Sequence, residues 1–278
     1  MFTASRTVGQ VEVTCLLDGS GPFTLATLEA TFPNATAADW SAARRLDPKA
    51  FGADGRWHLS FHCFAIRVPG GRIVLVDTGI GPADGPASTW APVPGRLPEA
   101  LAEAGIAASD VSLVVQTHLH TDHVGWAVSL EGDPVFSNAR YVVQRAELAA
   151  LEKAGSPLLE AVVRPLRQRD QLDAVDGSLD LLGGHGRHGA RIAVSATPGH
   201  TPGHQSVVVD SGADRMVITG DVLVHAVQLV NPDVRYTYED DADLARRSRR
   251  DLLADAEAHR AFLATAHLNQ PFMPTPLR

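Results

Sequence analysis

His118-Leu119-His120-Thr121-Asp122-His123 is the stretch of sequence that decides how this chain is read. Three imidazoles and one carboxylate fall within six residues, and they follow closely on residues 111–115, an apolar run typical of a buried strand. Imidazole nitrogens and carboxylate oxygens are ligands for zinc, iron and manganese. The stretch therefore predicts a metal site on a loop at the end of a strand.

The alternative is an accidental histidine tract in a polar surface loop, which has neither a buried strand before it nor partners elsewhere. This stretch has both. In three later segments a short apolar run is followed by a potential ligand: residues 194–200 ending on His200, residues 216–221 ending on Asp221, and residues 262–267 ending on His267. Because loops at one end of a rigid sheet present their side chains together, we expect these residues to meet.

The composition indicates a globular protein that acts on small molecules. With 278 residues, 45% of them hydrophobic, the chain can bury a sizeable core. It carries 24 basic and 32 acidic residues, a net charge of −8, so a nucleic-acid backbone would be repelled. The sequence does not fix the oligomeric state and is compatible with a homodimer.

The cysteines and the N-terminal residues bear on the cellular compartment. Cys15 and Cys63 form no Cys-x-x-Cys pair, so we expect buried free thiols rather than a disulfide framework or a thiolate zinc site. The first residues lack a charged region followed by an apolar core, and no apolar run approaches membrane-spanning length. We therefore expect a soluble cytoplasmic protein with no membrane partner.

Hydrophobic patterning predicts strands interspersed with helices, without an internal repeat. Strands are expected at residues 11–17, 61–68, 73–76, 111–115, 140–143, 191–196, 206–209, 216–219 and 262–266. Helices are expected at residues 37–46, 97–105, 146–153, 158–169 and 242–254. This order favours two sheets covered by helices. Residues 80–95 are rich in proline and glycine and are expected to form a loop, either on the surface or as a lid near the site.

The ligand pattern resembles that of the metallo-β-lactamase superfamily. The resemblance rests on His118-x-His120-x-Asp122-His123, on the later His200, Asp221 and His267, and on Asp77-Thr78-Gly79 upstream, and it spans residues 61–267. It implies an α/β (α+β) fold, a four-layer αββα sandwich, with the metals in a cleft at one edge of the two sheets. We expect a single domain, residues 1–278, with an N-terminal extension at about residues 1–60.

The resemblance also implies a role for each ligand. One metal would be held by His118, His120 and His200, and the other by Asp122, His123 and His267, with Asp221 as a bridge between them. Two zinc ions are expected, with iron, manganese or cobalt as alternatives. A hydroxide shared by the metals would be the nucleophile, since a zinc centre lowers the pKa of bound water to about 7. Asp122 and Asp221 are the expected catalytic residues, Asp122 orienting the nucleophile or passing a proton to the leaving group.

Other side chains are candidates for the surroundings of the metals. Asp77 either hydrogen-bonds a ligand histidine and fixes its tautomer, or caps the turn at the strand end. Thr117 and Thr201 are weaker candidates for the same role. His204, four residues beyond His200, is expected to pack or to donate and accept hydrogen bonds rather than to bind metal.

The residues expected to line the substrate pocket are His225 and Trp126. His225 lies four residues beyond Asp221, although a structural histidine is an equally good interpretation. Further aromatic candidates for a pocket lining, or alternatively for the core, are Trp57, Trp90, Tyr236 and Tyr238.

The basic run Arg246-Arg247-Ser248-Arg249-Arg250 suggests an anion site. Acidic residues flank it, however, and Asp243 and Arg247 are four residues apart, which suits an ion pair on a helix. We therefore expect a solvated helical face.

Details of the pattern favour a hydrolase. His120 stands where the diiron flavoprotein branch of the superfamily has glutamate. Residues 197–206 resemble those of N-acyl homoserine lactonases, but Val222, Leu223, Val224 and His225 follow Asp221 where those enzymes have a tyrosine that contacts the substrate. Residues 220–229 look more like the methyl parathion hydrolase group.

Three functions follow from these resemblances. The first is a dinuclear metal-dependent hydrolase that attacks a small ester, lactone or phosphotriester. The second is a mononuclear iron enzyme that resembles the sulfur dioxygenases of the same superfamily, for which His118, His200 and Asp221 would suffice. The third is a metal-binding protein without catalysis. Retention of Asp122, His123 and His267 favours the first.

Overall fold

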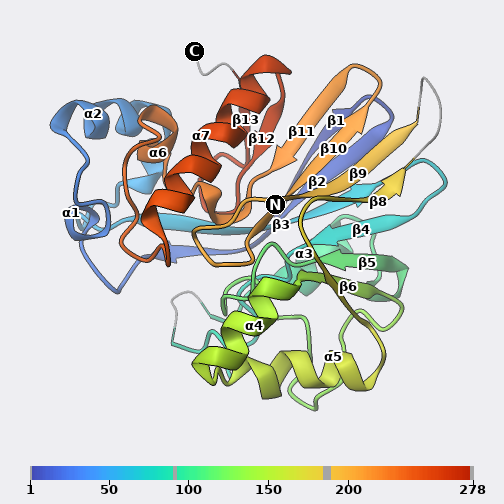
Figure 1. Cartoon of the computed structure of the whole chain (residues 1–278). Coiled ribbons are helices and arrows are strands. Elements are labelled where there is room, and N and C mark those ends of the chain that lie inside the picture. Colours follow the sequence, from blue (N-terminus) through green and yellow to red (C-terminus); the bar gives the residue numbers. More distant parts are fainter. Residues whose placement is uncertain (1, 90–92, 184–188, 276–278) are drawn as a thin grey trace.

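Two β-sheets pack face to face in a computed structural model that describes residues 2–89, 93–183 and 189–275 (Figure 1). The seven-stranded sheet contains, in spatial order, β1 (Thr3–Val8), β2 (Val11–Pro22), β3 (His58–Arg67), β4 (Ile73–Val76), β5 (Val111–Val115), β6 (Arg140–Gln144) and β7 (Leu172–Val175). The six-stranded sheet contains β13 (Phe272–Pro274), β12 (Phe262–Ala264), β11 (Asp214–Ile218), β10 (Gln205–Ser211), β9 (Ala190–Ala196) and β8 (Leu179–Gly183). Strands β4 to β7 are parallel to one another, as are β11 and β12, and the other pairs are antiparallel.

Strand β4 shows how the layers are built. Its side chains alternate between two apolar clusters: Val74 and Val76 lie between the sheets, whereas Ile73 and Leu75 pack under the helices on the outer face. Both faces of the strand are therefore dry, which explains why β4 is a continuous apolar run rather than an alternating one.

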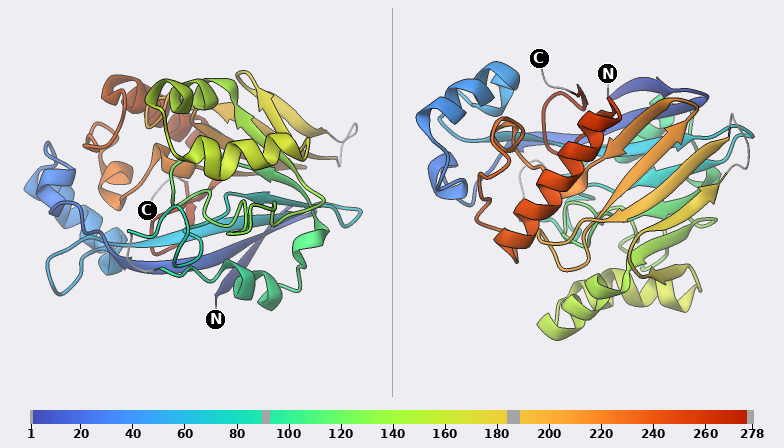
Figure 2. Two further views of the ribbon diagram at one scale, coloured as in Figure 1. Left: turned by 90° about the horizontal axis from the view of Figure 1, so that it is seen from below. Right: turned by 45° about the horizontal axis from the view of Figure 1, so that its top comes forward.

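Helices cover the outer face of each sheet (Figures 1 and 2). On the seven-stranded sheet these are α3 (Leu97–Glu103), α4 (Arg145–Ala154) and α5 (Arg164–Gln168), the last preceded by a π-helical turn at Leu159–Val163. On the six-stranded sheet lies α7 (Ala242–Ala258). The short helices α1 (Leu28–Thr31), α2 (Ala37–Leu46) and α6 (Ala226–Val230) gather at one end of the sandwich. The expected αββα arrangement is confirmed.

The N-terminal segment takes part in this sandwich through β1 and β2. Strands β1 and β2 pair with each other and β2 pairs with β3, so this part of the chain extends the seven-stranded sheet. Cys15 and Cys63 are free and buried, as expected, and they lie in different apolar clusters on opposite faces of the sheet. In the described ranges, no helix has both the length and the apolar character needed to cross a membrane.

Asp18 is hydrogen-bonded to both ends of the proline- and glycine-rich loop that follows β4. This buried carboxylate accepts hydrogen bonds from the amides of Ile80 and Leu97, at 2.5 and 2.6 Å. Gly79 has a φ of +65° and lies so close to Asp18 that a Cβ would come within 2.2 Å of its carboxylate, so this turn requires glycine. Residues 90–92 of the loop lie outside the described part.

Candidate metal centre

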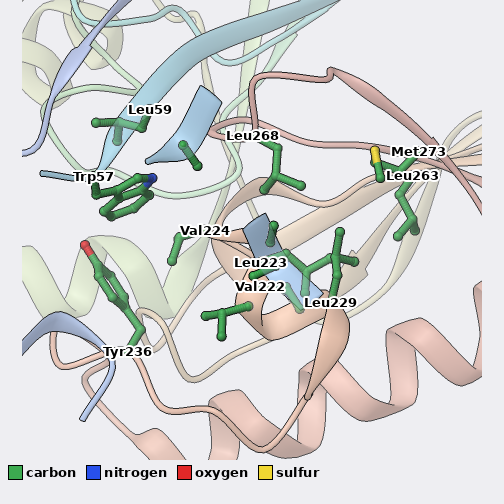
Figure 3. Packing of buried hydrophobic residues seen from close by; sticks show 14 of the residues in the cluster. Trp57, Leu59, Val222, Leu223, Val224, Leu229, Tyr236, Leu263, Leu268 and Met273 are labelled. Atoms are coloured by element: carbon green, nitrogen blue, oxygen red, sulfur yellow. The ribbon is translucent and has the colours of Figure 1, made fainter. Parts of the chain in front are cut away.

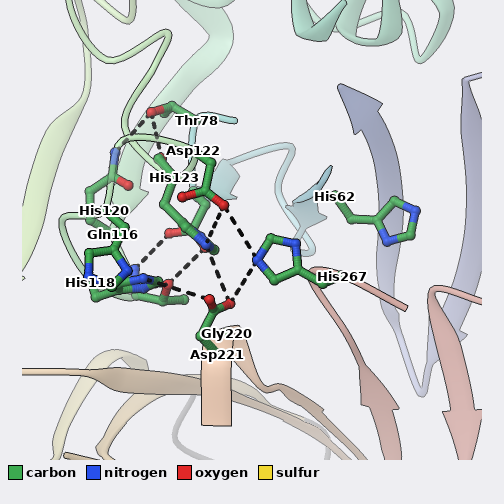
Figure 4. A network of polar contacts seen from close by, with 12 residues as sticks. His62, Thr78, Gln116, His118, His120, Asp122, His123, Gly220, Asp221 and His267 are labelled. Atoms are coloured by element: carbon green, nitrogen blue, oxygen red, sulfur yellow. Dashed lines mark hydrogen bonds and ion pairs between the residues drawn. The ribbon is translucent and has the colours of Figure 1, made fainter. Parts of the chain in front are cut away.

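Four loops bring the seven predicted ligands together. Figure 4 shows His118, His120, Asp122, His123, Asp221 and His267 converging. The cluster from His118 to His123 follows β5, and His200 lies on the turn between β9 and β10. Asp221 follows β11, and His267 follows β12. Strands from both sheets therefore deliver ligands to one place, as the sequence predicted.

Asp221 lies at the centre of the group, with its two carboxylate oxygens facing different histidines. Its Oδ2 is 3.9 Å from His118 Nε2 and 3.4 Å from His200 Nε2. Its Oδ1 is 3.4 Å from His123 Nε2 and 3.2 Å from His267 Nε2. A carboxylate placed in this way is positioned to bind two cations at once, one through each oxygen.

Each oxygen of Asp221 faces one compact group of ligand atoms. The first group is His118, His120 and His200, and the second is Asp122, His123 and His267; a further set, His118, His123 and Asp221, spans the two. Within each group the ligand atoms lie within 4.8 Å of one another. These are the two sets that the resemblance implied, so the geometry supports two neighbouring metal sites.

The donor atoms fit cations because several of them have no other partner. His118 Nε2, His123 Nε2 and Asp221 Oδ1 are buried and make no hydrogen bond in the described structure. A buried polar atom without a partner costs about 1–3 kcal/mol. Several buried, unpartnered nitrogen and oxygen atoms that face one point fit a metal site.

Hydrogen bonds at Nδ1 of His123 and of His267 orient the Nε2 atom of each ring toward Asp221. His123 Nδ1 donates to Asp77 Oδ2 at 2.8 Å, and His267 Nδ1 donates to the carbonyl oxygen of Ser60 at 2.9 Å. Each bond fixes the tautomer that leaves Nε2 free to bind metal.

Asp77 also orients His118, through the hydroxyl of Thr117. The hydroxyl of Thr117 donates to Asp77 Oδ2 at 2.8 Å, so it accepts from His118 Nδ1 at 3.0 Å. The amide of Thr117 donates to Asp77 Oδ1 at 2.7 Å. Asp77 thus holds a histidine of each group, which confirms the first of its two predicted roles. In contrast, the buried hydroxyl of Thr201 has no hydrogen-bond partner in the described structure.

His204 supports the backbone of Asp221 rather than joining either group. Its Nε2 accepts a hydrogen bond from the amide of Asp221 at 2.9 Å, and its Nδ1 donates to the hydroxyl of Thr197 at 2.9 Å. Burial lowers the pKa of His204 to about 4, which keeps the ring neutral and able to accept. His204 hydrogen-bonds rather than ligates, as the sequence suggested.

Burial and the carboxylates of Asp122 and Asp221 determine the charge of the histidines. Burial lowers the pKa of His118 and of His200 well below the usual range, so both rings are neutral, the form that can bind a metal. Burial acts in the same direction on His123 and His267, but Asp221 and Asp122 raise their pKa values above it. In the absence of cations these two rings hold protons that a metal would displace.

A cavity of about 810 Å³ opens directly onto the ligands. His120, Asp122, His200, Asp221 and His267 form its floor. The walls are mostly apolar and aromatic, and they include Leu25, Trp57, Leu59, Leu119, Leu158, Tyr236 and Tyr238. None of the described lining residues is a lysine or an arginine.

Three of the aromatic residues singled out in the sequence line this cavity: Trp57, Tyr236 and Tyr238. Trp90 lies outside the described residues. Pro86 also lines the cavity, so the loop after β4 borders the site. No sequence signal indicated that Leu25, which precedes α1, and Leu158, which precedes α5, would line the cavity, because an apolar side chain looks the same in a core and in a pocket.

The structure corrects the two predicted pocket residues, His225 and Trp126, which are not among the cavity's lining residues. His225 is only 1% exposed, and its ring contacts the aromatic rings of Phe32, Trp40, Phe51 and Trp57. Its Nδ1 accepts from the amide of Val227 and so caps α6. Helix capping, not substrate contact, explains its position four residues after Asp221.

Trp126 serves the loop that borders the cavity rather than the cavity itself. Its indole N–H donates to Asp18 at 3.1 Å, so it joins the amides of Ile80 and Leu97 on that carboxylate. Its ring lines a separate apolar pocket of about 290 Å³ beside α3.

The buried position of His225 predicts a contribution to the pH dependence of stability. Burial lowers its pKa to about 3, whereas an unfolded histidine titrates near 6.5. Between these values the unfolded state binds more protons, so the free energy of unfolding falls as the pH falls, by about 1.4 kcal/mol per pH unit from this group. His225→Asn retains a capping acceptor but does not titrate. Urea unfolding at pH 4.5, 5.5 and 6.5 should show a shallower slope for this variant, and equal slopes would contradict the assignment.

A comparison with known families identifies the fold. Residues 61–267, well over half of the chain, match the sequence model of the metallo-beta-lactamase superfamily. The chain belongs to the metallo-β-lactamase superfamily. The matched residues begin in β3 and end on His267, so they contain all seven ligands.

Similar proteins of the superfamily include lactonases. An N-acyl homoserine lactonase from Bacillus cereus is 28% identical over 123 residues, which are 44% of this chain and 42% of that protein. The N-acyl homoserine lactonase AttM from Azorhizobium caulinodans is 36% identical over 114 residues, 38% of each chain. The chain thus matches about two fifths of the length of these curated relatives.

Solved structures of the superfamily match over nearly the whole chain. The hydrolase AbOPH superposes with a TM-score of 0.80 at 23% identity, covering 98% of this chain and 92% of its own. AidC, described as a dizinc quorum-quenching lactonase in complex with a product, superposes with a TM-score of 0.76 at 21% identity, covering 99% and 94%. At these identities the similarity shows the shared fold.

Proposed function

We propose that this protein is a dinuclear metal-dependent hydrolase of neutral, largely apolar lactones or esters. The position of Asp221 carries the proposal, because its two oxygens face two separate groups of ligands. An enzyme with one metal would use the first group and leave Asp122, His123 and His267 without a function. Two zinc ions suit imidazole and carboxylate donors, and iron, manganese and cobalt are alternatives.

Asp122 and Asp221 have different roles in the proposed hydrolysis. When bound, a metal pair lowers the pKa of a coordinated water and polarises the oxygen of the scissile group. Asp122 lines the cavity, and its Oδ2 is 3.6 Å from His123 Nε2 and 3.5 Å from His267 Nε2. We assign to this carboxylate the proton that leaves the attacking water, which it then passes to the leaving-group oxygen. Asp221 lies between the two ligand groups and fixes their positions relative to each other.

The walls of the cavity support a neutral substrate. The described lining contains no lysine or arginine to pair with an anion, and Asp240 is among its residues, whereas the charge of Glu239 is balanced by Arg249. A carboxylate or phosphate on the distal part of a substrate would find no cationic side chain to pair with among the described lining residues, whereas an acyl chain or an aryl group would be buried favourably. Lactones, carboxyl esters and phosphotriesters all satisfy this requirement. The superfamily relatives named as N-acyl homoserine lactonases favour the lactone.

The test is metal analysis of freshly purified protein combined with a hydrolysis screen. We expect about two metal ions per chain and hydrolysis of an N-acyl homoserine lactone or an aryl ester that stops with a chelator and returns with zinc. A matched ester that carries a carboxylate should react at least about tenfold more slowly. One iron per chain with oxygen uptake on a persulfide would support the dioxygenase instead. Full metal content with no hydrolysis of lactones, aryl esters or phosphotriesters would contradict the proposal.

A further inference from the structure

Arg249 departs from the other arginines of the basic run on α7. The sequence predicted a solvated face with a pair between Asp243 and Arg247. Arg246 and Arg250 lie on such a face, but Asp243 pairs with Arg246 instead, and Arg250 pairs with Asp233. The side chain of Arg249 is 0% exposed. A guanidinium is rarely buried unless every part of it is paired, so its partners indicate its purpose.

The partners of Arg249 belong to two segments that meet at the cavity. Its Nε donates to the carbonyl oxygen of Val222 at 2.8 Å, in the residue that follows Asp221. Its Nη1 donates to the carbonyl oxygens of Pro232 and Val234, at 2.9 and 3.1 Å. Its Nη2 pairs with the buried carboxylate of Glu239.

We call residues 232–240 the wall segment, because Tyr236, Tyr238 and Glu239 within it line the cavity. The ring of Tyr236 lies nearly parallel to that of the ligand His200, with centroids 5.9 Å apart and 18° between the planes. Figure 3 shows Val222, Leu223 and Val224 packed between Tyr236 and Trp57 on one side and Leu263 and Leu268 on the other. The wall segment and the Asp221 loop therefore share one apolar core.

Further hydrogen bonds join the wall segment to the ligand loops. Gln228 accepts from the amide of Val224 at 3.0 Å and donates to the carbonyl oxygen of Val234 at 3.3 Å. The amide of Asp240 donates to the carbonyl oxygen of His200 at 3.1 Å. Among these links, Arg249 alone contacts the wall segment at three residues and the Asp221 loop at the same time.

We propose that Arg249 is a positioning residue that fixes the wall segment relative to Asp221 and thereby sets the selectivity of the cavity for the apolar part of its substrate. The chemistry of the side chain suits this role, since the planar guanidinium donates in several fixed directions and Glu239 balances its charge. A lysine has one nitrogen and cannot reach the two segments together. The selectivity part of this inference rests on the proposed function.

The experiment compares Arg249→Lys with Arg246→Lys, a matched change on the same helix at a side chain that is 43% exposed. Hydrogen exchange measured by mass spectrometry should be at least about tenfold faster at residues 232–240 in Arg249→Lys, and unchanged in Arg246→Lys. The ratio of kcat/KM for a decanoyl to that for a butanoyl homoserine lactone should fall about tenfold in Arg249→Lys, with two metals per chain retained. Binding of the matching non-hydrolysable lactams, measured by calorimetry, should lose the same chain-length preference.

Each outcome decides the inference. Unchanged exchange and an unchanged chain-length ratio in Arg249→Lys would overturn it, as would equal changes in both variants. If Arg249→Lys does not fold, Glu239→Gln tests the same network, since it removes the charge that balances Arg249 and should shift both readouts in the same direction. If the fully metallated wild-type protein hydrolyses no lactone, aryl ester or phosphotriester, the proposed function fails, while the exchange experiment still decides whether Arg249 fixes the wall segment.

Discussion

Asp221→Asn is expected to lower the metal content from about two ions to at most one per chain, and kcat/KM by well over about 100-fold. Loss of a residue that only orients a ligand typically costs 10–100-fold in metal affinity or activity, and Asp221 contributes an oxygen to each group itself. The neutral amide also removes the negative charge that offsets the repulsion between two neighbouring cations. Metal analysis after gel filtration, together with lactone or ester hydrolysis, measures both effects.

The control for this variant is Asp251→Asn, which makes the same change in charge at an exposed position on α7. It should retain both metals and full activity. A variant at Asp221 that kept two metals and remained within about tenfold of the wild-type kcat/KM would show that this carboxylate is not a bridge.

Asp77→Asn is expected to weaken metal binding by about 10–100-fold. This carboxylate accepts from His123 Nδ1 and from Thr117, and the hydroxyl of Thr117 in turn orients His118. Asp77 has a φ of +60°, a conformation that asparagine tolerates, so the variant changes charge and hydrogen bonding with little strain. Competition with a chromophoric zinc chelator measures the zinc affinity of each of the two metal sites.

Thr117→Val separates the two arms of this network. It removes the hydroxyl that accepts from His118 and leaves the bond between Asp77 and His123 intact. We therefore expect one of the two affinities to fall in Thr117→Val and both to fall in Asp77→Asn. Zinc affinities that are unchanged in Asp77→Asn would contradict the role assigned to this carboxylate.

The strands in the interior of the sheets were predictable, whereas those at the edges were not. The four edge strands, β1, β7, β8 and β13, were not predicted. An interior strand such as β4 is buried on both faces and is a clear apolar run. Strand β8 has only exposed or half-buried residues, and β7 only half-buried ones, so neither carries an apolar pattern.

The ligands of the candidate site were predictable for a chemical reason. Imidazole and carboxylate groups are common metal ligands, and here they follow several strand-like runs, so position and residue type point to the same function. The pocket was not predictable in this way. His225 and Trp126 were chosen for their nearness in sequence to ligands, but they cap a helix and hold a loop. Arg249 was hidden within a charged run whose other members are exposed or half-buried, and only tertiary packing sets it apart.

Anomalous diffraction at the zinc edge, from crystals grown with zinc, tests the central claim most directly. The account predicts two peaks about 3.5–4 Å apart, one among His118, His120 and His200 and the other among Asp122, His123 and His267, with Asp221 between them. A single peak confined to the first group, or no peak at either group, would contradict it.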